Sequence, residues 1–212
     1  MKKLPVSFYQ RENVLQIARE LLGKLLVTKW NGIVTSGRIV EVEAYRGVID
    51  KASHAFGGRR TARNEIMYAK GGVAYVYLCY GMHHLFNVVT NSPGTPHAIL
   101  IRALEPVKGK ETMRLRVGKK KPGSPALQSG DGVDYSLTRG PGNLSKALGL
   151  YTKHNGFSLR SKELFIAEDG FFFNKKEIAA SRRIGVDYAG MDALLSYRFF
   201  IKGNPFVSGK PK

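Results

Sequence analysis

The sequence predicts a single α+β domain, and three observations support this prediction. An amphipathic helix is indicated near the N-terminus, a tight turn joins two strands after it, and three further segments have the pattern of an antiparallel meander. A length of 212 residues is most simply one domain, and an apolar content of 43% argues against disorder. Residues 1–212 are therefore expected to form one domain.

The first predicted elements are a helix and a long hairpin. Residues 25–28 and 32–45 read as strands, because they are rich in apolar residues and a turn sequence, Asn31-Gly32, separates them. Gly23 is expected to end the helix that precedes them. The apolar face of that helix follows helical spacing and consists of Val14, Ile17, Ala18, Leu21 and Leu22.

The middle of the chain combines an irregular segment with a meander. Residues 47–72 hold many glycines and charges with little apolar periodicity, so a long and partly helical functional excursion is expected there. Residues 73–79, 85–90 and 98–104 are expected to form three antiparallel strands. The turns between them are expected at 80–83 and 91–94.

The last part of the chain predicts shorter elements. Residues 108–132 are polar and basic, and we expect a helix end there followed by a mobile loop, with the mobile basic part at 110–132. A short helix is expected at 142–148, a hairpin at 164–173 around Asp169-Gly170, and a final strand at 199–202.

The charge balance favours a polyanionic partner. The chain has 34 Lys and Arg against 16 Asp and Glu, a formal net charge of +18. Such a charge concentrates and steers polyanions, so nucleic acid is the favoured partner and an anionic membrane face is second. A merely soluble basic enzyme is the plain alternative.

Cysteine and apolar content suggest the compartment. The single cysteine, Cys79, excludes an internal disulfide and a cysteine-cluster metal site, and it is expected to be a small buried apolar residue. No segment approaches the roughly 20 apolar residues of a membrane span. We therefore expect the protein in the cytoplasm, with the nucleoid if it is bacterial, and without a membrane.

Two charged residues on apolar strands are the candidate catalytic residues. Alternation places Glu41, Glu43 and Tyr45 on one face of their strand. Arg102 is similarly unusual, because it is a charged residue in the otherwise apolar strand 98–104. A buried Glu43 would need a hydrogen-bonding or cationic partner, and pairing with Arg102 would keep it ionised beside a water. A structural ion pair is the equally weighted alternative.

A pair of neighbouring carboxylates also suggests a glycoside hydrolase. Glu41 and Glu43 stand side by side on one strand, so they would not flank a scissile bond from opposite sides. This interpretation is disfavoured, and Glu41 is expected to be a surface or arginine-paired charge.

Four tyrosines, at 45, 75, 77 and 80, could stack on bases. Such stacking is worth roughly 1–3 kcal/mol per base. Tyr80 lies at a predicted turn, where its ring could wedge into a base step. Half-buried strand tyrosines are common, so only their clustering near Glu43 in so basic a chain favours the functional interpretation.

Metal and cofactor motifs are missing from the sequence. The histidines lack zinc-site spacing, and a zinc deaminase would need two more cysteines. No Walker loop or dinucleotide-binding glycine pattern occurs. The chemistry is therefore expected to need no metal and no cofactor.

Several motifs in a fixed order resemble the alkyladenine (3-methyladenine) DNA glycosylase family, in its short bacterial form. The resemblance spans roughly residues 14–207, and together the motifs are highly specific. They are Glu41-Val-Glu-Ala-Tyr45, Gly58-Arg-Arg-Thr-Ala-Arg-Asn64, Tyr75-Val-Tyr77, Tyr80-Gly-Met82, Ile101-Arg-Ala-Leu-Glu-Pro106, Leu137-Thr-Arg-Gly-Pro141 and Arg183-Ile-Gly-Val186.

The resemblance implies a curved antiparallel sheet with flanking helices and an enzyme that removes alkylated or deaminated purines from duplex DNA. It implies that Glu43 activates a water, which Arg102 and the carbonyl of Val186 help to hold. The implied base pocket has walls of Tyr45, His54 and Tyr77, with Asn87 discriminating against the exocyclic amino group of guanine. Tyr80 would fill the gap in the duplex.

The resemblance also implies a monomer that binds double-stranded DNA containing damaged purines. The product would be an abasic site and a free base. No obvious activated lysine lies near the motifs, so we expect a monofunctional glycosylase without lyase activity. The main alternative is a non-catalytic basic nucleic-acid-binding module, in which Glu43 and Arg102 are only structural.

Overall fold

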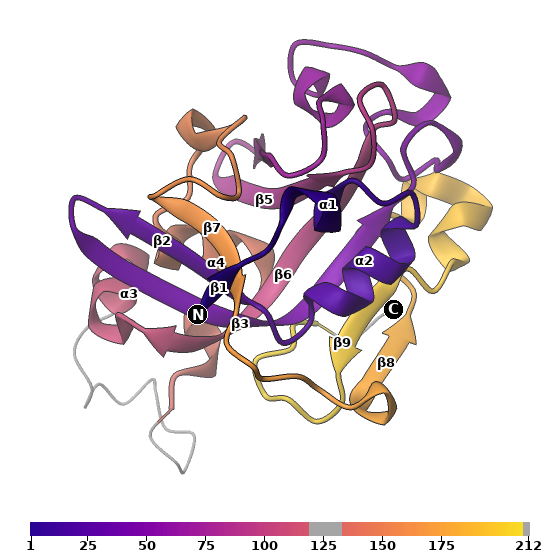
Figure 1. The fold of residues 1–212 in the computed structure, drawn as a ribbon. Coiled ribbons are helices and arrows are strands. Elements are labelled where there is room, and N and C mark those ends of the chain that lie inside the picture. The colour runs from indigo at the N-terminus through magenta and orange to yellow at the C-terminus, as the bar shows by residue number, and fades with distance from the viewer. Residues whose placement is uncertain (119–132, 210–212) are drawn as a thin grey trace.

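The fold is described by a computed structural model that covers residues 1–118 and 133–209 (Figure 1). One curled antiparallel sheet of nine strands forms its frame. The sheet order is β1-β7-β2-β3-β6-β5-β4, with β9 paired to β3 and β8 paired to β9. The strands are β1 (Lys2–Lys3), β2 (Leu25–Trp30), β3 (Ile33–Tyr45), β4 (Ala74–Cys79), β5 (His83–Thr90), β6 (His97–Lys108), β7 (Leu164–Glu168), β8 (Ile178–Ser181) and β9 (Arg198–Ile201).

Strand β3 is the centre of the frame. Its first half pairs with β2, its second half pairs with β9 from Glu41 to Glu43, and β6 runs along its other edge. The β3–β6 register shifts on both sides of Glu41, so Glu41 faces Ala103 while Val42 faces Ile101. Arg102 therefore lies at an irregularity that directs its side chain towards two neighbouring glutamates.

Short helices cover the sheet. Helix α2 begins at Asn13, whose side chain accepts a hydrogen bond from the Gln16 N–H at 3.1 Å. Its buried face packs on β3 and lies in front of that strand in Figure 1. Within the described ranges, the α-helices are α1 (Val6–Tyr9), α2 (Val14–Leu21), α3 (Lys110–Val117) and α4 (Pro141–Leu148).

The predicted α+β class, curved antiparallel sheet and first elements are confirmed. The α2 helix ends before Gly23, and Asn31-Gly32 forms the β2–β3 turn with positive φ at both residues. The meander is β4, β5 and β6. The excursion at 47–72 lies above the sheet in Figure 1 and contains three 3₁₀ helices, Gly47–Ile49, Phe56–Gly58 and Glu65–Tyr68.

One expectation for the C-terminal half is wrong. Residues 164–173 do not form a hairpin, because β7 takes β1 and β2 as its partners and ends at Glu168. The helix expected at the start of the basic segment is α3, and its Met113 is buried in the core. The rest of the expected loop, from 119 to 132, lies outside the described residues. No helix in the described ranges is long and apolar enough to cross a bilayer.

Candidate active site

A cavity of about 790 Å³ opens where β3, β4 and β6 meet the excursion and the segment after β8. Its walls include backbone and side chains from all these elements, so residues distant in the sequence share one hollow. The residues predicted to form the site that line it are Tyr45, His54, Tyr77, Tyr80, Asn87, Arg102 and Val186.

Glu43 lies directly behind the cavity wall. Its side chain is fully buried, and its carboxylate accepts two hydrogen bonds and makes one ion pair. The Ile184 backbone N–H donates to Oε1 at 2.7 Å, and Arg102 Nη1 lies 3.3 Å from the same oxygen. The Tyr45 hydroxyl donates to Oε2 at 2.9 Å. All three partners line the cavity, so the carboxylate is separated from the cavity only by the residues that it contacts.

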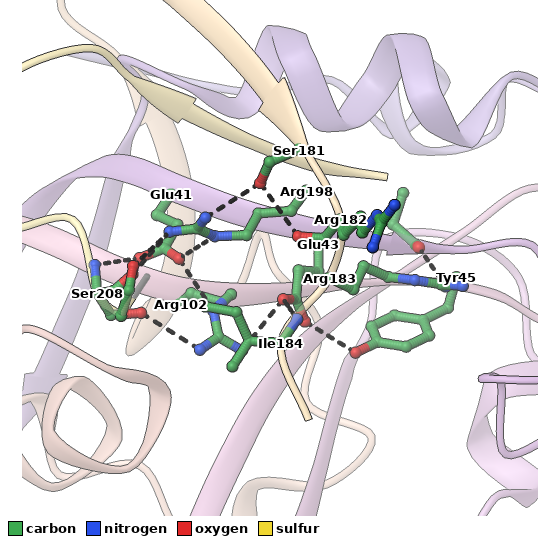
Figure 2. Close-up of polar contacts among 12 residues, drawn as sticks. Glu41, Glu43, Tyr45, Arg102, Ser181, Arg182, Arg183, Ile184, Arg198 and Ser208 are labelled. Atoms are coloured by element: carbon green, nitrogen blue, oxygen red, sulfur yellow. Dashed lines mark hydrogen bonds and ion pairs between the residues drawn. The ribbon is translucent and has the colours of Figure 1, made fainter. Parts of the chain in front are cut away.

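Arg102 joins the two glutamates of β3 (Figure 2). Its Nε donates to Glu41 Oε1 at 3.0 Å while its Nη1 faces Glu43. Glu41 is also bound by Arg198 Nε at 2.7 Å. Glu41 is thus arginine-paired as predicted, but it is completely buried rather than at the surface.

The segment that carries Val186 is held by a second buried ion pair. Arg183 lies after β8 and makes two contacts with the carboxylate of Asp50, at 2.6 and 2.8 Å. It also donates to the Ala44 carbonyl at 3.0 Å. This pairing fastens the segment to β3 and to the excursion, and it places Ile184 against Glu43. The carbonyl of Val186 accepts from Ala189 N–H at 2.9 Å and has a second lone pair for another donor.

Three rings form one wall of the cavity. His54 packs edge-on against Tyr77 with ring centroids 4.7 Å apart, and Tyr75 lies 5.2 Å from Tyr77. The Tyr75 hydroxyl is 2.8 Å from His54 Nδ1, so Tyr75 fixes the imidazole from behind. Burial, followed by the cations Arg63 and Arg59, lowers the pKa of His54 to about 4. The imidazole is therefore neutral at pH 7.

Tyr45 contributes a ring and a hydroxyl. The guanidinium of Arg183 stacks on its ring, 4.9 Å from the centroid. Burial raises the pKa of Tyr45 well above its usual value, and the nearby Glu43 and Tyr77 raise it further. The hydroxyl consequently stays protonated and acts as a hydrogen-bond donor to Glu43.

Asn87 is fixed on the cavity wall, whereas Tyr80 projects from it. The Asn87 side chain is buried, and its Nδ2 donates to the carbonyls of Tyr75 and Leu85 at 3.1 and 3.3 Å. Tyr80 is 87% exposed at the tip of the β4–β5 turn and has a φ of 50°. A positive φ is unfavourable for a bulky residue, and such strain is most often retained at functional positions.

Basic residues surround the entrance. Lys51, Arg59 and Arg63 line the cavity, and Arg63 also lies 4.9 Å above the Tyr77 ring. Cys79 lines the cavity too and is partly exposed, so the expectation of a buried apolar cysteine is wrong. It ends β4 at the site rather than in the core.

Several functional contacts were missed at the level of sequence. Asp50, Tyr75, Arg198 and Ser208 hold the predicted site residues in place, although none of them was assigned that role. The signal for the missed charges was weak. Arg198 stands in an apolar strand as Arg102 does, and this pattern could have identified it. Within the described ranges, no group of three histidine, cysteine or acidic side chains is arranged to hold a metal ion.

A protein-family profile and several known proteins match this chain over all the residues of the site. A profile of the family described as methylpurine-DNA glycosylase (MPG) matches residues 7–205. A Bacillus cereus (strain G9842) protein named "Putative 3-methyladenine DNA glycosylase" is 47% identical over 209 residues, which cover 97% of this chain and 98% of that protein. A protein of the same name from Bacillus anthracis (strain A0248) is 46% identical over 209 residues, with the same coverage.

Proposed function

Because the chain belongs to the methylpurine-DNA glycosylase family, it is a DNA glycosylase for alkylated bases, and we propose how its cavity carries out that reaction. An alkylated or deaminated purine leaves the stack of duplex DNA and enters the cavity. A water activated by Glu43 then hydrolyses its N-glycosidic bond, and the products are a free base and an abasic site.

One observation carries this proposal. A buried carboxylate, held by two hydrogen bonds and an ion pair, lies directly behind an aromatic cavity large enough for a nucleotide base. A base inside a duplex cannot reach such a group, so extrusion is required at a cost of a few kcal/mol. A purely structural ion pair would not require an adjoining aromatic hollow.

The contacts of Glu43 suit a general base. An ionised carboxylate has about four acceptor positions. Ile184 and Tyr45 take two of them by hydrogen bonds, and Arg102 lies close to a third as an ion pair. A water in the remaining position could also donate to the free lone pair of the Val186 carbonyl. As the glycosidic bond breaks, positive charge develops on the sugar, and the negative charge of Glu43 stabilises it while accepting a proton from the water.

The aromatic wall suits an alkylated purine. Alkylation at a ring nitrogen makes the base cationic, which improves it as a leaving group. Tyr45 and Tyr77 would attract such a ring by cation–π contacts of roughly 0.5–2 kcal/mol each. The neutral state of His54 avoids repelling that cation. Asn87, fixed on the wall, would clash with the exocyclic amino group of an undamaged guanine.

The strained tip of the β4–β5 hairpin is suited to act as a plug, a side chain that fills the gap in the duplex. The Tyr80 ring is exposed beside the cavity, where it could occupy the space that the extruded base leaves. Stacking there would offset part of the cost of extrusion. The strain at φ 50° would then be retained because it aims the ring at the duplex.

We propose a monofunctional enzyme. Among the residues that the structure describes, Lys51 is the lysine that lines the cavity, and it is exposed rather than buried beside Glu43. A lyase would need an amine that attacks the sugar and forms a Schiff base. Trapping of a covalent DNA adduct with borohydride would contradict this proposal. The protein is further proposed to act as a cytoplasmic monomer on double-stranded DNA, without metal or cofactor.

The deciding experiment uses duplex DNA that contains 3-methyladenine. Glu43→Gln keeps the shape and hydrogen-bonding partners of the side chain but removes its basicity, so excision should fall by roughly 10²- to 10⁴-fold while binding to damaged DNA is retained. Released base and abasic sites are measured in single-turnover reactions.

The matched control is Glu163→Gln, which changes an exposed glutamate that does not line the cavity. It should excise at the wild-type rate. Near-normal release by Glu43→Gln would sink the assignment of the base. A wild-type protein that binds the lesion without releasing it would instead favour a non-catalytic binding module.

A further inference from the structure

Glu41 is a completely buried carboxylate that accepts hydrogen bonds from Arg102, Arg198 and Ser208 (Figure 2). Its Oε1 accepts from Arg102 Nε at 3.0 Å and from Arg198 Nε at 2.7 Å. Its Oε2 accepts from the Ser208 backbone N–H at 2.6 Å. Glu41 does not line the cavity, so its effect on a substrate must pass through another residue.

That residue is Arg102. The guanidinium is a rigid planar fork, so fixing two of its nitrogens fixes the third. Its Nε is bound to Glu41, and its Nη2 donates to Ser208 Oγ at 3.3 Å. Only Nη1 is left for Glu43, at 3.3 Å from Oε1. Figure 2 shows Glu41 and Ser208 on one side of Arg102, with Glu43 and Ile184 on the other.

Arginine and carboxylate ordinarily prefer a bidentate pair with two parallel hydrogen bonds. Such a pair between Arg102 and Glu43 would occupy both carboxylate oxygens, and no acceptor position would remain for a water. Glu41 binds the Nε of the same guanidinium and so keeps Arg102 from forming this bidentate pair with Glu43. The contact with Glu43 is therefore single, and one acceptor position remains on that carboxylate.

Arg198 completes the charge balance. Two glutamates and two arginines make the formal charge of the cluster zero, so the charge of Glu41 is compensated within the cluster. Arg198 is itself anchored by Ser181 Oγ at 3.1 Å and by the Ser208 carbonyl at 2.6 Å. The segment around Ser208 thus binds Glu41, Arg102 and Arg198 together.

We propose that Glu41 is a positioning residue for the reaction, and that Ser208 holds it in this role. It keeps Arg102 in a single contact with Glu43, so that Glu43 can bind and activate the water. This inference rests on the proposed function, in which Glu43 is the general base. It assigns to the carboxylate of Glu41 a role in the reaction, which an ordinary structural ion pair would not have.

The test is the rate of 3-methyladenine release as a function of pH under single-turnover conditions. In Glu41→Gln, Arg102 would turn towards Glu43, and the cluster would carry one negative charge fewer. The loss of a neighbouring negative charge favours the ionised form of Glu43, and the turn of Arg102 blocks the position of its water. We expect the rate to fall on the order of 100-fold and the acid limb of the profile to move to lower pH.

Other charged and titratable groups face Glu43 and must be unchanged in this comparison. They are Tyr45 on β3, Arg198 on β9, Arg183 after β8, and Tyr188 in the 3₁₀ helix Asp187–Leu194. A double-mutant cycle separates them from Arg102. If Glu41 acts through Arg102, the effect of Glu41→Gln will be largely lost in an Arg102→Gln background. An equal effect in both backgrounds would overturn the proposal.

Ser208→Pro provides a second readout that leaves the charge unchanged. It removes the Ser208 N–H that donates to Glu41 and the Ser208 hydroxyl that accepts from Arg102. The acid limb of the pH profile should therefore move in the same direction, with a smaller loss of rate. Should Glu41→Gln fail to fold, this variant decides alone. The matched control is Glu20→Gln, which removes a glutamate from the remote Arg11 pair and should leave the profile unchanged.

The outcomes are distinguishable from those of the proposed function. If the wild-type protein releases no 3-methyladenine, the proposed function fails. If it does, and the profiles of Glu41→Gln and Ser208→Pro have the wild-type shape, the positioning role of Glu41 fails while the proposed function stands. A lowered melting temperature without a displaced acid limb would identify a merely structural ion pair.

Discussion

His54 illustrates how burial sets the chemistry of a single side chain. The Tyr75 hydroxyl binds its Nδ1, and burial with two neighbouring arginines lowers its pKa to about 4. Histidine in an unfolded chain has a pKa near 6.5. The folded state therefore takes up its proton later than the unfolded state as the pH falls, and this difference couples the site to stability.

We expect His54→Gln to lose less stability on acidification than the wild-type protein. Below pH 6.5 the unfolded histidine binds a proton that the folded one refuses, so the wild-type stability falls as the pH drops from 6.5 towards 4. Above pH 6.5 this contribution is constant. Melting temperatures at pH 7 and pH 5 measure it. His83→Gln, at an exposed histidine, is the control, and equal acid sensitivity of both variants would contradict the expectation.

At this scale, the sequence identified residues whose type is unusual for their position. Glu43 and Arg102 stand out because a charge on an apolar strand needs a partner, and the structure brings the two together. Asp50 and Arg183 could not be paired in this way, because a loop residue carries no such pattern. Their contact depends on how the excursion and the segment after β8 approach each other. The roles of the site residues remain predictions.

Among the elements, the β4–β5 hairpin combines strain with exposure. Its tip is Tyr80-Gly81, with φ values of 50° and 70°. Asn-Gly is the favoured sequence for such a turn, because asparagine tolerates positive φ far better than tyrosine does. The hairpin has therefore kept a residue that is poor for folding, and the proposed plug explains why.

Tyr80→Asn should separate folding from function. The turn should be at least as stable as in the wild-type protein, because asparagine relieves the strain. Excision from duplex DNA should fall about 10-fold, since a lost stacking contact is worth roughly 1–3 kcal/mol. The single-stranded substrate is the control, because it leaves no gap to fill. A similar loss on both substrates would argue against the plug.

Elements with strong local signals were predictable, and elements defined by distant partners were not. The helix before Gly23 and the Asn31-Gly32 hairpin carry their own periodicity and turn residues. The 164–173 hairpin was wrong because Asp169-Gly170 is a turn sequence, yet β7 finds its partners in β1 and β2. The short strand β8 has only four residues and lacked a recognisable pattern.

For the whole molecule, charge is the dominant property. A net charge of +18 exceeds what the buried ion pairs need, since those pairs balance within themselves. The surplus must lie on the surface, and Lys51, Arg59 and Arg63 bring part of it to the entrance of the cavity. Binding to a phosphate backbone would release counterions from DNA, which makes the affinity depend on salt.

The affinity for duplex DNA should fall steeply with salt. A slope of roughly −0.9 in log K against log salt is expected for each phosphate contacted. Arg63→Gln should reduce the slope by about 1 if this residue contacts a phosphate. Equilibrium binding between 50 and 200 mM salt measures the slope, with Glu163→Gln as the control. A response that is nearly flat would contradict a phosphate footprint.

The placement of Glu43 between two neighbouring strands has one more consequence. Its backbone lies opposite β6 on one edge and β9 on the other, so the carboxylate is built into the most constrained part of the frame. The protein has little freedom to follow a poorly seated nucleotide. Adaptation must then come from the nucleic acid, and repair should proceed fastest at lesions whose flanking base steps bend and unstack with little resistance.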